Sequence, residues 1–441
     1  MSADSTSLAQ TVAAALLGSA VVGTSCVLWQ RTAHIYRTAV PSGSGNPDET
    51  IARVVELWVY PVKGMKGIPL QEVALRRSSA GGFLWDRRFC VCDAATGRCV
   101  TQRELPALAT VTTALEDTDP GSWYGTRAKW LKLTSPVGTC ISVPCESGVN
   151  ADDSDNSPHF RTVSVWGDTV SAEDCGEVAA AFLVKTLGRD GLRLVRFAGS
   201  RPSAELGDRA PTVDAPGFAG PREPIYGTAF SDQFQFMLAS TSSLASLNNR
   251  IARRNVRETI DMTRFRPNIV VHGSRPWTED RWSTFQLIAP GKARGSDIRF
   301  HIVKPAARCS VVTTDQDTGE TSADIEPLGT LQTFRTGAQV KGWSSELQAD
   351  RVFFGTYLVA EGAGGVGHEE DPAAPTTVAV GAKVVVTNWR RTSKWELLSA
   401  TCERCRSTAT ATATTMPHCA SCWPQNNVRV CLRRAAMVWG W

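Results

Sequence analysis

The sequence predicts a β-rich α+β fold in which short strands form a barrel or a sandwich, with only a few helices. Apolar segments rich in β-branched residues recur at short intervals, and Gly or Pro residues separate them. The composition agrees with this prediction, because 36 glycines and 14 tryptophans accompany only 5 tyrosines, as is typical of a chain rich in strands and turns.

Length and charge narrow the possible classes. A chain of 441 residues is long enough for about two or three domains. Its apolar content of 42% and charged content of 20% are ordinary for a globular protein. A formal charge of +4 is too small to indicate nucleic acid binding. The 13 cysteines are an odd number and no N-x-Ser/Thr acceptor occurs, which favours a reducing compartment over a disulfide-bonded fold.

The N-terminal 30 residues predict a membrane anchor. Leu8 to Trp29 is an uncharged run of 22 residues, about long enough to span a bilayer. Asp4 is the only charge before this run, whereas Arg31, His34 and Arg37 follow it. A cleaved secretory signal needs positive charge before its apolar run, so we expect a signal anchor with the remainder of the chain facing the cytosol. A cleaved signal is the alternative, and residues 31–50 are predicted to be a flexible linker.

Residues 51–190 are predicted to form the first folded domain. One helix is expected, starting near Glu177, whose charge suits the first turn of a helix, and closed by Gly188. The predicted strands of this domain are residues 53–60, 71–75, 88–92, 129–134, 141–143 and 162–166.

Residues 191–390 are predicted to form the second domain. A helix is expected over residues 240–251, and the Gly/Pro-rich residues 202–224 predict a long loop that is either functional or disordered. The predicted strands are residues 192–197, 235–238, 269–271, 282–288, 351–359 and 383–386.

The segment from Lys304 to Gly319 contains the strongest candidate for chemistry. Residues 310–314 are mostly β-branched and predict a short strand, and the Asp/Gly cluster after them predicts a tight turn. Cys309 stands at the entrance of the predicted strand, beside Arg308. An arginine next to a thiol favours the thiolate, the form that binds metal or attacks as a nucleophile. A buried structural cysteine is the alternative.

Several separated motifs together resemble one family. The motifs are Tyr-Pro-Val-Lys at 60–63, Asp-Arg-Arg-Phe at 86–89, Asp-Cys-Gly-Glu at 174–177, Phe-Arg-Pro-Asn at 265–268, Arg-Cys at 308–309 with Thr-Thr-Asp at 313–315, and Phe-Gly-Thr-Tyr at 354–357. In this order they resemble the MOSC proteins (molybdenum cofactor sulfurase C-terminal), and among them the mitochondrial amidoxime reducing components, from about Ile51 to Trp389. The resemblance implies a MOSC β-barrel core with the cofactor site in residues 191–390 and an N-terminal MOSC-type β-barrel in residues 51–190.

The resemblance also implies a molybdenum–molybdopterin cofactor and the residues that hold it. Cys309 would be the catalytic residue and the protein ligand of molybdenum, because a thiolate is compatible with a metal that already carries soft sulfur ligands. Fixed positive charge for the cofactor phosphate would come from Lys63, Arg87, Arg266 and Arg308. Hydrogen bonds to the pterin would come from Ser231, Asp232, Asn268 and Tyr357.

Each of these residues has a plainer alternative. A lone Arg or Lys is commonly a solvated surface charge, and Asn268, which follows a proline, could simply cap a strand. The chain also departs from the family at Gly64 and Ala307, where relatives carry small polar residues near the cofactor, which puts those two contacts in doubt.

The Cys-rich tail, residues 391–441, predicts a second metal site. Four cysteines form two Cys-x2-Cys pairs separated by 13 residues, a spacing that suits structural zinc: Cys402, Cys405, Cys419 and Cys422. The Thr/Ala run at residues 407–415 argues against a compact turn between the pairs, so a disordered tail is the alternative.

The function implied by the resemblance is reduction of N-hydroxylated substrates, such as amidoximes and hydroxylamines. The chain has no convincing NAD or flavin fingerprint, so electrons must come from partner proteins, which in the family are cytochrome b5 and cytochrome b5 reductase. The family also implies the mitochondrial outer membrane. The alternatives are a molybdenum cofactor-binding or sulfur-transfer module related to the cofactor sulfurases, and a zinc-tethered adaptor without enzymatic activity.

Overall fold

The computed structural model describes the central part of the chain. All described residues belong to one compact unit, residues 43–441. They are residues 50–76, 81–116, 128–146, 159–199, 228–254, 256, 258–291, 297–343, 347–360 and 376–390. The predicted membrane anchor at Leu8 to Trp29 and the predicted zinc ligands lie outside these residues. In the described part of the chain, no helix combines the length and apolar character needed to cross a membrane.

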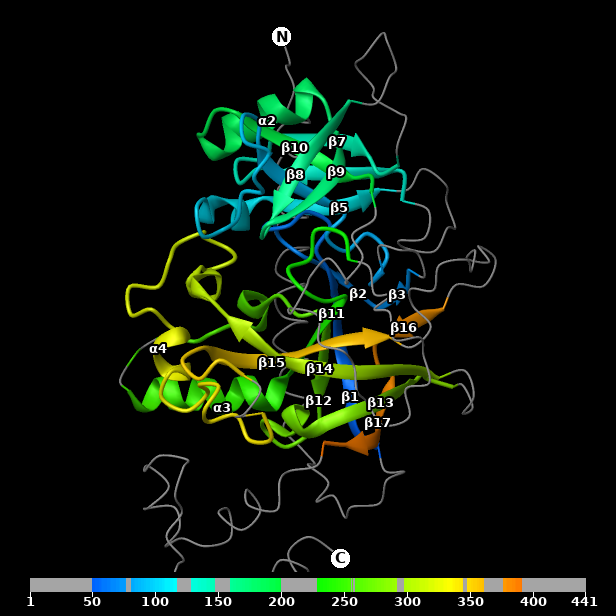
Figure 1. Cartoon of the computed structure of the whole chain (residues 1–441), viewed down its shortest axis with the longest axis vertical. Helices are drawn as coiled ribbons and strands as arrows, with labels where there is room; N and C mark the ends of the chain where they lie inside the picture. Colours follow the sequence, from blue (N-terminus) through cyan, green and yellow to red (C-terminus); the bar gives the residue numbers. More distant parts are fainter. Residues whose placement is uncertain are drawn as a thin grey trace, which may run out of the picture. The chain divides into compact units, whose positions relative to one another are not determined.

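A closed barrel of seven strands forms the core of the fold (Figure 1). The barrel closes because β1 (Thr50–Val59) pairs with β17 (Lys383–Trp389) on one side and with β12 (Ile269–His272) on the other. β2 (Ile68–Leu70) extends the sheet beyond β1. Around the barrel the strands are β12 (Ile269–His272), β11 (Phe236–Ser240), β15 (Val352–Ala360), β14 (Ile298–Arg308), β13 (Trp282–Ile288), β17 (Lys383–Trp389) and β1 (Thr50–Val59).

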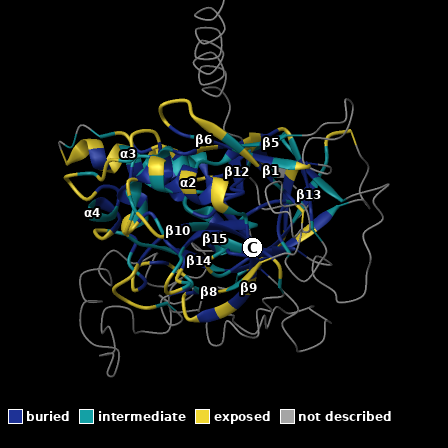
Figure 2. Cartoon of the chain, turned by 90° about the horizontal axis from the view of Figure 1, so that it is seen from above, coloured by how far each residue is buried: buried dark blue, intermediate teal, exposed yellow. Residues whose placement is uncertain are grey.

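The barrel is held together by a chain of packed aromatic rings. Phe236 meets Phe300 edge to face at 5.4 Å, and Phe300 stacks on Phe285, also at 5.4 Å between ring centroids. These rings are fully buried and come from β11, β14 and β13. Each such pair adds about 0.5–1.5 kcal/mol beyond simple area burial. Figure 2 shows the buried positions concentrated on the strands.

A second apolar cluster packs on the barrel beside α3 (Thr241–Arg253). The helix begins at Ser240, whose side chain accepts a hydrogen bond from the Ser242 amide at 3.2 Å and so satisfies one of the free donors of the first turn. Leu247 and Ile251, four residues apart on one face, are fully buried in this cluster with Phe265. The short helix α4 (Leu328–Leu331) contributes Leu331 to the same cluster.

Two smaller sheets are built mainly from the first half of the chain. One has the order β4 (Phe89–Asp93), β10 (Leu192–Phe197), β9 (Asp168–Asp174) and β8 (Phe160–Val165). The other is the meander of β5 (Thr112–Glu116), β6 (Trp130–Thr134) and β7 (Cys140–Pro144). Helix α2 (Glu177–Leu187) packs on β10 and β7 and ends at Gly188, which has the left-handed φ of 65° expected of a C-terminal glycine. A two-stranded ladder joins β3 (Glu72–Ala74) to β16 (Thr377–Ala379).

The predicted strand at residues 310–314 is wrong. Residues Ser310–Thr313 form a short 3-10 helix, η5, closed by the hydrogen bond from the Val312 amide to the Cys309 carbonyl at 3.2 Å. The strand instead precedes the cysteine, because β14 continues past a register shift at Pro305 and Ala307 and ends at Arg308. Val312 is buried in the α3 cluster, so packing overrides its strand propensity. Cys309 therefore follows a strand and does not begin one.

Candidate functional site

One cavity is lined by all nine residues predicted for the molybdenum cofactor site. They come from sequence positions as far apart as 63 and 357, and the fold brings them together around Arg308 at the end of β14, Tyr357 within β15 and the segments beside these strands. The two positions that depart from the family pattern, Gly64 and Ala307, line the same cavity. The nine residues are Lys63, Arg87, Ser231, Asp232, Arg266, Asn268, Arg308, Cys309 and Tyr357.

Cys309 places a partly exposed thiol in the cavity wall. Its pairing strand ends at Arg308, which is opposite Val352, and the backbone then turns into η5. Of the seven described cysteines, Cys309 is the one that lines the cavity, and Cys90, Cys92, Cys99 and Cys145 are buried elsewhere. The described residues hold no cluster of three or more His, Cys, Asp or Glu side chains suited to a metal ion. Cys309 is thus a single protein thiol available to a ligand in the cavity.

Two arginines form one cationic wall by enclosing the ring of Tyr60. The guanidinium carbon of Arg87 lies 4.4 Å from the ring centroid, and that of Arg266 lies 4.2 Å from it. Both arginines have left-handed backbones, with φ of 50° and 54°. Burial raises the pKa of Tyr60, so the phenol stays neutral, and its hydroxyl donates to the Pro267 carbonyl at 3.2 Å. Both guanidinium groups therefore contact the same neutral ring.

The two arginines differ in how their charge is balanced. Arg87 Nη1 donates to both carboxylate oxygens of Asp86, at 2.7 and 2.5 Å. Although burial alone would lower the pKa of Arg87, Asp86 raises it above the ordinary value. Among the described residues, Arg266 Nη1 donates to the amide oxygen of Gln316 alone, at 3.2 Å, and burial lowers the pKa of Arg266 to about 10. Arg266 Nη2 is buried and has no hydrogen-bond partner among the described residues.

Like Arg266, Arg308 is a cation that forms no ion pair with a carboxylate of the described residues. Its Nε donates to the carbonyls of Ala306 and Phe354 at 3.2 and 3.1 Å, and its Nη1 donates to the Phe265 carbonyl at 3.1 Å. Burial lowers the pKa of Arg308, as expected for a charge whose partners are neutral. A bound anion would compensate these guanidinium groups, because charged groups away from water need a partner. The donor set, a thiol with two uncompensated guanidinium groups, fits a phosphate-bearing metal cofactor.

Lys63 is already engaged within the protein. Its ammonium donates to the Phe230 carbonyl at 2.8 Å and forms an ion pair with Asp232. The Asp232 side chain is exposed at the cavity; the protein around it still removes part of its water, which alone would raise its pKa, but Lys63 and a hydrogen bond from Trp166 Nε1 at 2.8 Å lower the pKa well below the ordinary value. An ammonium has three N–H donors, and contacts with the described residues use two of those of Lys63.

Asn268 makes two hydrogen bonds to neighbouring backbone segments. Its Oδ1 accepts from the Met237 amide, and its Nδ2 donates to the Trp58 carbonyl, both at 3.2 Å. The side chain thus ties β1 to β11 at the cavity floor. Tyr357 stands on β15 with its ring centroid 5.4 Å from that of Phe234, and burial raises the pKa of Tyr357.

Sequence reasoning missed a group of residues that support the site. Gln316 lies in the Asp-rich turn and exchanges hydrogen bonds with Gln102 at 3.0 and 3.2 Å, and Gln102 Nε2 also donates to the Gly64 carbonyl at 2.6 Å. Trp166 and Arg103 line the cavity as well. Nothing local marks these residues, because every one of these contacts joins segments that are distant in sequence.

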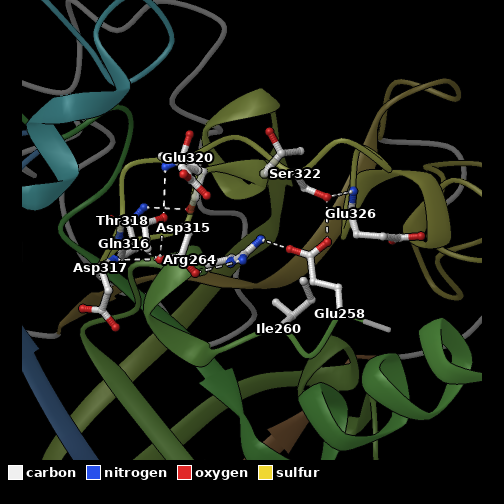
Figure 3. A network of polar contacts seen from close by, with 12 residues as sticks. Glu258, Ile260, Arg264, Asp315, Gln316, Asp317, Thr318, Glu320, Ser322 and Glu326 are labelled. Atoms are coloured by element: carbon white, nitrogen blue, oxygen red, sulfur yellow. Dashed lines mark hydrogen bonds and ion pairs between the residues drawn. The ribbon is translucent and has the colours of Figure 1, made fainter. Parts of the chain in front are cut away.

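The turn that carries Gln316 is fixed by the network in Figure 3. Asp315 Oδ1 accepts from the amides of Asp317 and Thr318, both at 2.9 Å. Its Oδ2 accepts from Arg264 Nη2 at 3.1 Å, and Arg264 also pairs with Glu258 at 2.7 Å. The predicted turn is confirmed by the hydrogen bond from the Gly319 amide to the Asp315 carbonyl at 2.9 Å. The turn therefore presents Gln316 to Arg266 in a defined position.

Two family models match the chain, and together they cover more than half of it. Residues 51–190 match the MOSC N-terminal beta barrel domain, and residues 226–385 match the MOSC domain. Among curated proteins, mitochondrial amidoxime-reducing component 1 of Homo sapiens is 29% identical over 79% of this chain and 89% of its own length. Mitochondrial amidoxime reducing component 2 of Homo sapiens is 26% identical over 73% and 81%. Molybdenum cofactor sulfurase of Danio rerio is 26% identical over 73% of this chain, but over only 34% of its own length.

Proposed function

Because the chain belongs to the MOSC family and carries both of its domains, we propose that it is a molybdenum-cofactor enzyme that reduces N-hydroxylated substrates such as amidoximes and hydroxylamines. The names of the similar human proteins support this substrate class. The observation that carries the proposal is the cavity in which the Cys309 thiol lies with two guanidinium groups that no described carboxylate pairs.

The residues that would hold the cofactor divide by chemistry. Cys309 would ligate molybdenum, since a thiolate suits a metal with soft ligands. Arg266 and Arg308 would bind the phosphate, because their N–H groups form a fixed fork. Lys63 and Arg87 would add positive charge near the phosphate. Hydrogen bonds to the pterin would come from Ser231, Asp232, Asn268 and Tyr357. When bound, the cofactor supplies the electron transfer to the N–O bond, and the protein binds, orients and shields the reacting groups.

The reaction needs an external source of electrons. Reduction of an N–OH group to N–H consumes two electrons and two protons and releases water. We propose cytochrome b5 and cytochrome b5 reductase as donors, acting at the mitochondrial outer membrane, to which residues 8–29 would anchor the chain. The names of the similar proteins include the word mitochondrial, which supports the organelle. The zinc site at Cys402, Cys405, Cys419 and Cys422 stays a separate prediction that metal analysis of the full chain can test.

A second candidate function is cofactor binding or sulfur transfer. The similarity to molybdenum cofactor sulfurase favours it, since the match covers 73% of this chain. It spans only 34% of the sulfurase, so whatever the remainder of that protein contributes has no counterpart in the match. Such a module would bind the cofactor without reducing amidoximes, and this outcome separates the two candidates.

Substitution of Cys309 tests the proposal. The purified full chain should contain molybdenum near one atom per chain and should reduce benzamidoxime with the two donor proteins. Cys309→Ser should lower turnover at least about a hundredfold, because serine does not supply the soft ligand. Cys140→Ser, which changes an exposed cysteine outside the cavity, should leave turnover unchanged. Full turnover by Cys309→Ser would refute the assignment, and molybdenum binding without turnover in the wild type would favour the second candidate.

A further inference from the structure

Three exposed side chains form the rim of the cavity. Among the described residues that line it, Arg103, Trp166 and Asp232 are exposed, and the other lining residues are partly or fully buried. The three are joined to one another. The guanidinium carbon of Arg103 lies 4.4 Å from the Trp166 ring centroid, and Trp166 Nε1 donates to Asp232 Oδ1 at 2.8 Å. The indole is therefore fixed both at its face and at its edge.

The backbone at Trp166 argues that this position serves more than folding. Trp166 and Gly167 are the two turn residues between the paired positions Val165 and Asp168 of β8 and β9. Both have positive φ, 56° and 95°, which such turns require and which Asn-Gly adopts most easily. A bulky aromatic residue is rare there. Of the six described non-glycine residues with positive φ, three line this cavity, namely Arg87, Trp166 and Arg266, and such outliers cluster at functional sites.

The chemistry of the rim differs from that of the interior. The interior offers the thiol of Cys309 and the partly buried cations Arg266 and Arg308, which suit a metal cofactor with an anionic group. The rim offers the flat indole of Trp166, of which 43% remains exposed although Arg103 lies over the ring. Flat conjugated groups stack on such a ring, and aliphatic groups of the same polarity gain much less from it.

We propose that Trp166, oriented by Arg103 and Asp232, is a specificity-determining residue that stacks with the aromatic group of aryl N-hydroxylated substrates. The inference rests on the proposed reductase function and adds a substrate class to it. Aryl amidoximes are preferred over alkyl amidoximes because the aryl ring is held at the rim while the N–OH group reaches inward toward Cys309.

The test compares two substrates that share one reacting group. Benzamidoxime and acetamidoxime are reduced by the holoenzyme with a reduced viologen as the electron donor, so that docking of a protein donor does not enter the measurement. Trp166→Leu, which keeps an apolar side chain without the ring, should raise KM for benzamidoxime roughly tenfold, in line with the loss of one aromatic contact. KM for acetamidoxime and both kcat values should stay within about twofold. Trp389→Leu is the matched control, because Trp389 is 41% exposed and does not line the cavity.

Two further variants guard against a folding defect. Trp166→Phe keeps a flat ring and should retain most of the preference for benzamidoxime. Arg103→Gln leaves the indole in place but removes the cation over it, and should raise KM for benzamidoxime by a smaller factor than Trp166→Leu does. Quenching of tryptophan fluorescence by benzamidoxime gives a readout without turnover, and it should be weaker in Trp166→Leu than in the wild type or in Trp389→Leu.

The possible results separate this inference from the proposed function. Failure of the wild type to reduce either substrate would overturn the proposed function. Reduction of both substrates, with KM changed equally for the two or for neither in Trp166→Leu, would overturn the role of Trp166 alone. An effect of Trp166→Leu that occurs only with a protein electron donor would also overturn it, because the rim would then contact that donor.

Discussion

Replacement of Glu279 by glutamine should stabilise the protein at neutral and alkaline pH. Glu279 lies in the 3-10 helix η4 (Thr278–Arg281) and is fully buried. Its Oε1 accepts a hydrogen bond from Ser243 Oγ on α3, while its Oε2 has no partner among the described residues. Its neighbour Asp280 is engaged by Arg335 at 2.6 and 3.0 Å. Burial, with a further contribution from the negative charge of Asp280, raises the pKa of Glu279 to about 7.

The direction of the pH effect follows from this raised pKa. The ordinary pKa of a glutamate is 4.5, so between that value and about 7 the folded protein holds a proton that the unfolded chain has released. The free energy of unfolding therefore falls as the pH rises through this window. The shift of the Glu279 pKa from 4.5 to about 7 corresponds to a loss on the order of 3 kcal/mol in the free energy of unfolding once Glu279 is fully deprotonated. Glu279→Gln keeps an acceptor for Ser243 without a charge, so it should remove this loss.

Urea unfolding from about pH 5 to about pH 8 measures the effect. The variant and the wild type should differ little at the acidic end, and the variant should be more stable by up to about 3 kcal/mol at the alkaline end. Glu320→Gln, at an exposed position, is the matched control and should show no such trend. A difference between Glu279→Gln and wild type that is constant over the whole range would show that Glu279 does not bind a proton on folding, and the reasoning would be wrong.

Two further substitutions probe the site and the barrel. Gln316→Leu should weaken cofactor retention, measured as molybdenum per chain after gel filtration. The substitution removes the only described hydrogen-bond partner of Arg266 Nη1, and a hydrogen bond to a charged group is typically worth about 1.5–3 kcal/mol. An unchanged molybdenum content would count against a positioning role of Gln316. Gly355→Ala should lower the free energy of unfolding by several times the roughly 1 kcal/mol of an ordinary substitution, because Gly355 has φ of 72° and an added Cβ would lie 2.6 Å from the Leu238 carbonyl oxygen. A loss below about 1 kcal/mol in urea would show that the β11–β15 contact relaxes easily.

The elements that the sequence predicted best are those whose ends are marked by residues that stop a helix or a strand. The helix Glu177–Leu187 has its predicted limits, because an apolar run is followed directly by Gly188. The strands Leu192–Phe197 and Trp282–Ile288 also have their predicted limits. The strand Asp168–Asp174 was missed, since its exposed positions are polar and its identity depends on pairing with β8. Pairing between strands is not visible in a single segment.

The segment after Cys309 shows why local propensity failed. Val311, Val312 and Thr313 favour strand geometry when considered alone. In the structure the preceding strand has already ended, and the chain must turn at once toward the Asp315 turn and its contact with Arg264. Four residues of 3-10 helix achieve this with hydrogen bonds of 3.2 Å from the amides of Val312 and Thr314. Long-range anchoring therefore decided the local conformation.

The candidate site was predictable to the extent that motifs carry it. The motif residues are found in one cavity, although their roles toward a cofactor remain predictions. The residues that orient them were not predictable. Trp166 meets Asp232 across 66 positions, and Gln316 meets Gln102 across 214. Neither side chain stands in a pattern that a lone sequence can show.

The charge that remains at the cavity follows from the contacts around Tyr60. Arg87 and Arg266 lie so close that Arg87 Nη2 donates to the Arg266 carbonyl at 3.1 Å, and two unbalanced guanidinium groups in that position would destabilise the fold. Asp86 balances Arg87, and the same carboxylate accepts from the Tyr60 amide at 2.8 Å, which ties the ion pair to β1. Since Asp86 is committed to Arg87, Arg266 keeps its charge for a ligand. On this arrangement we expect the wall to bind an anion more tightly than a neutral group of the same shape.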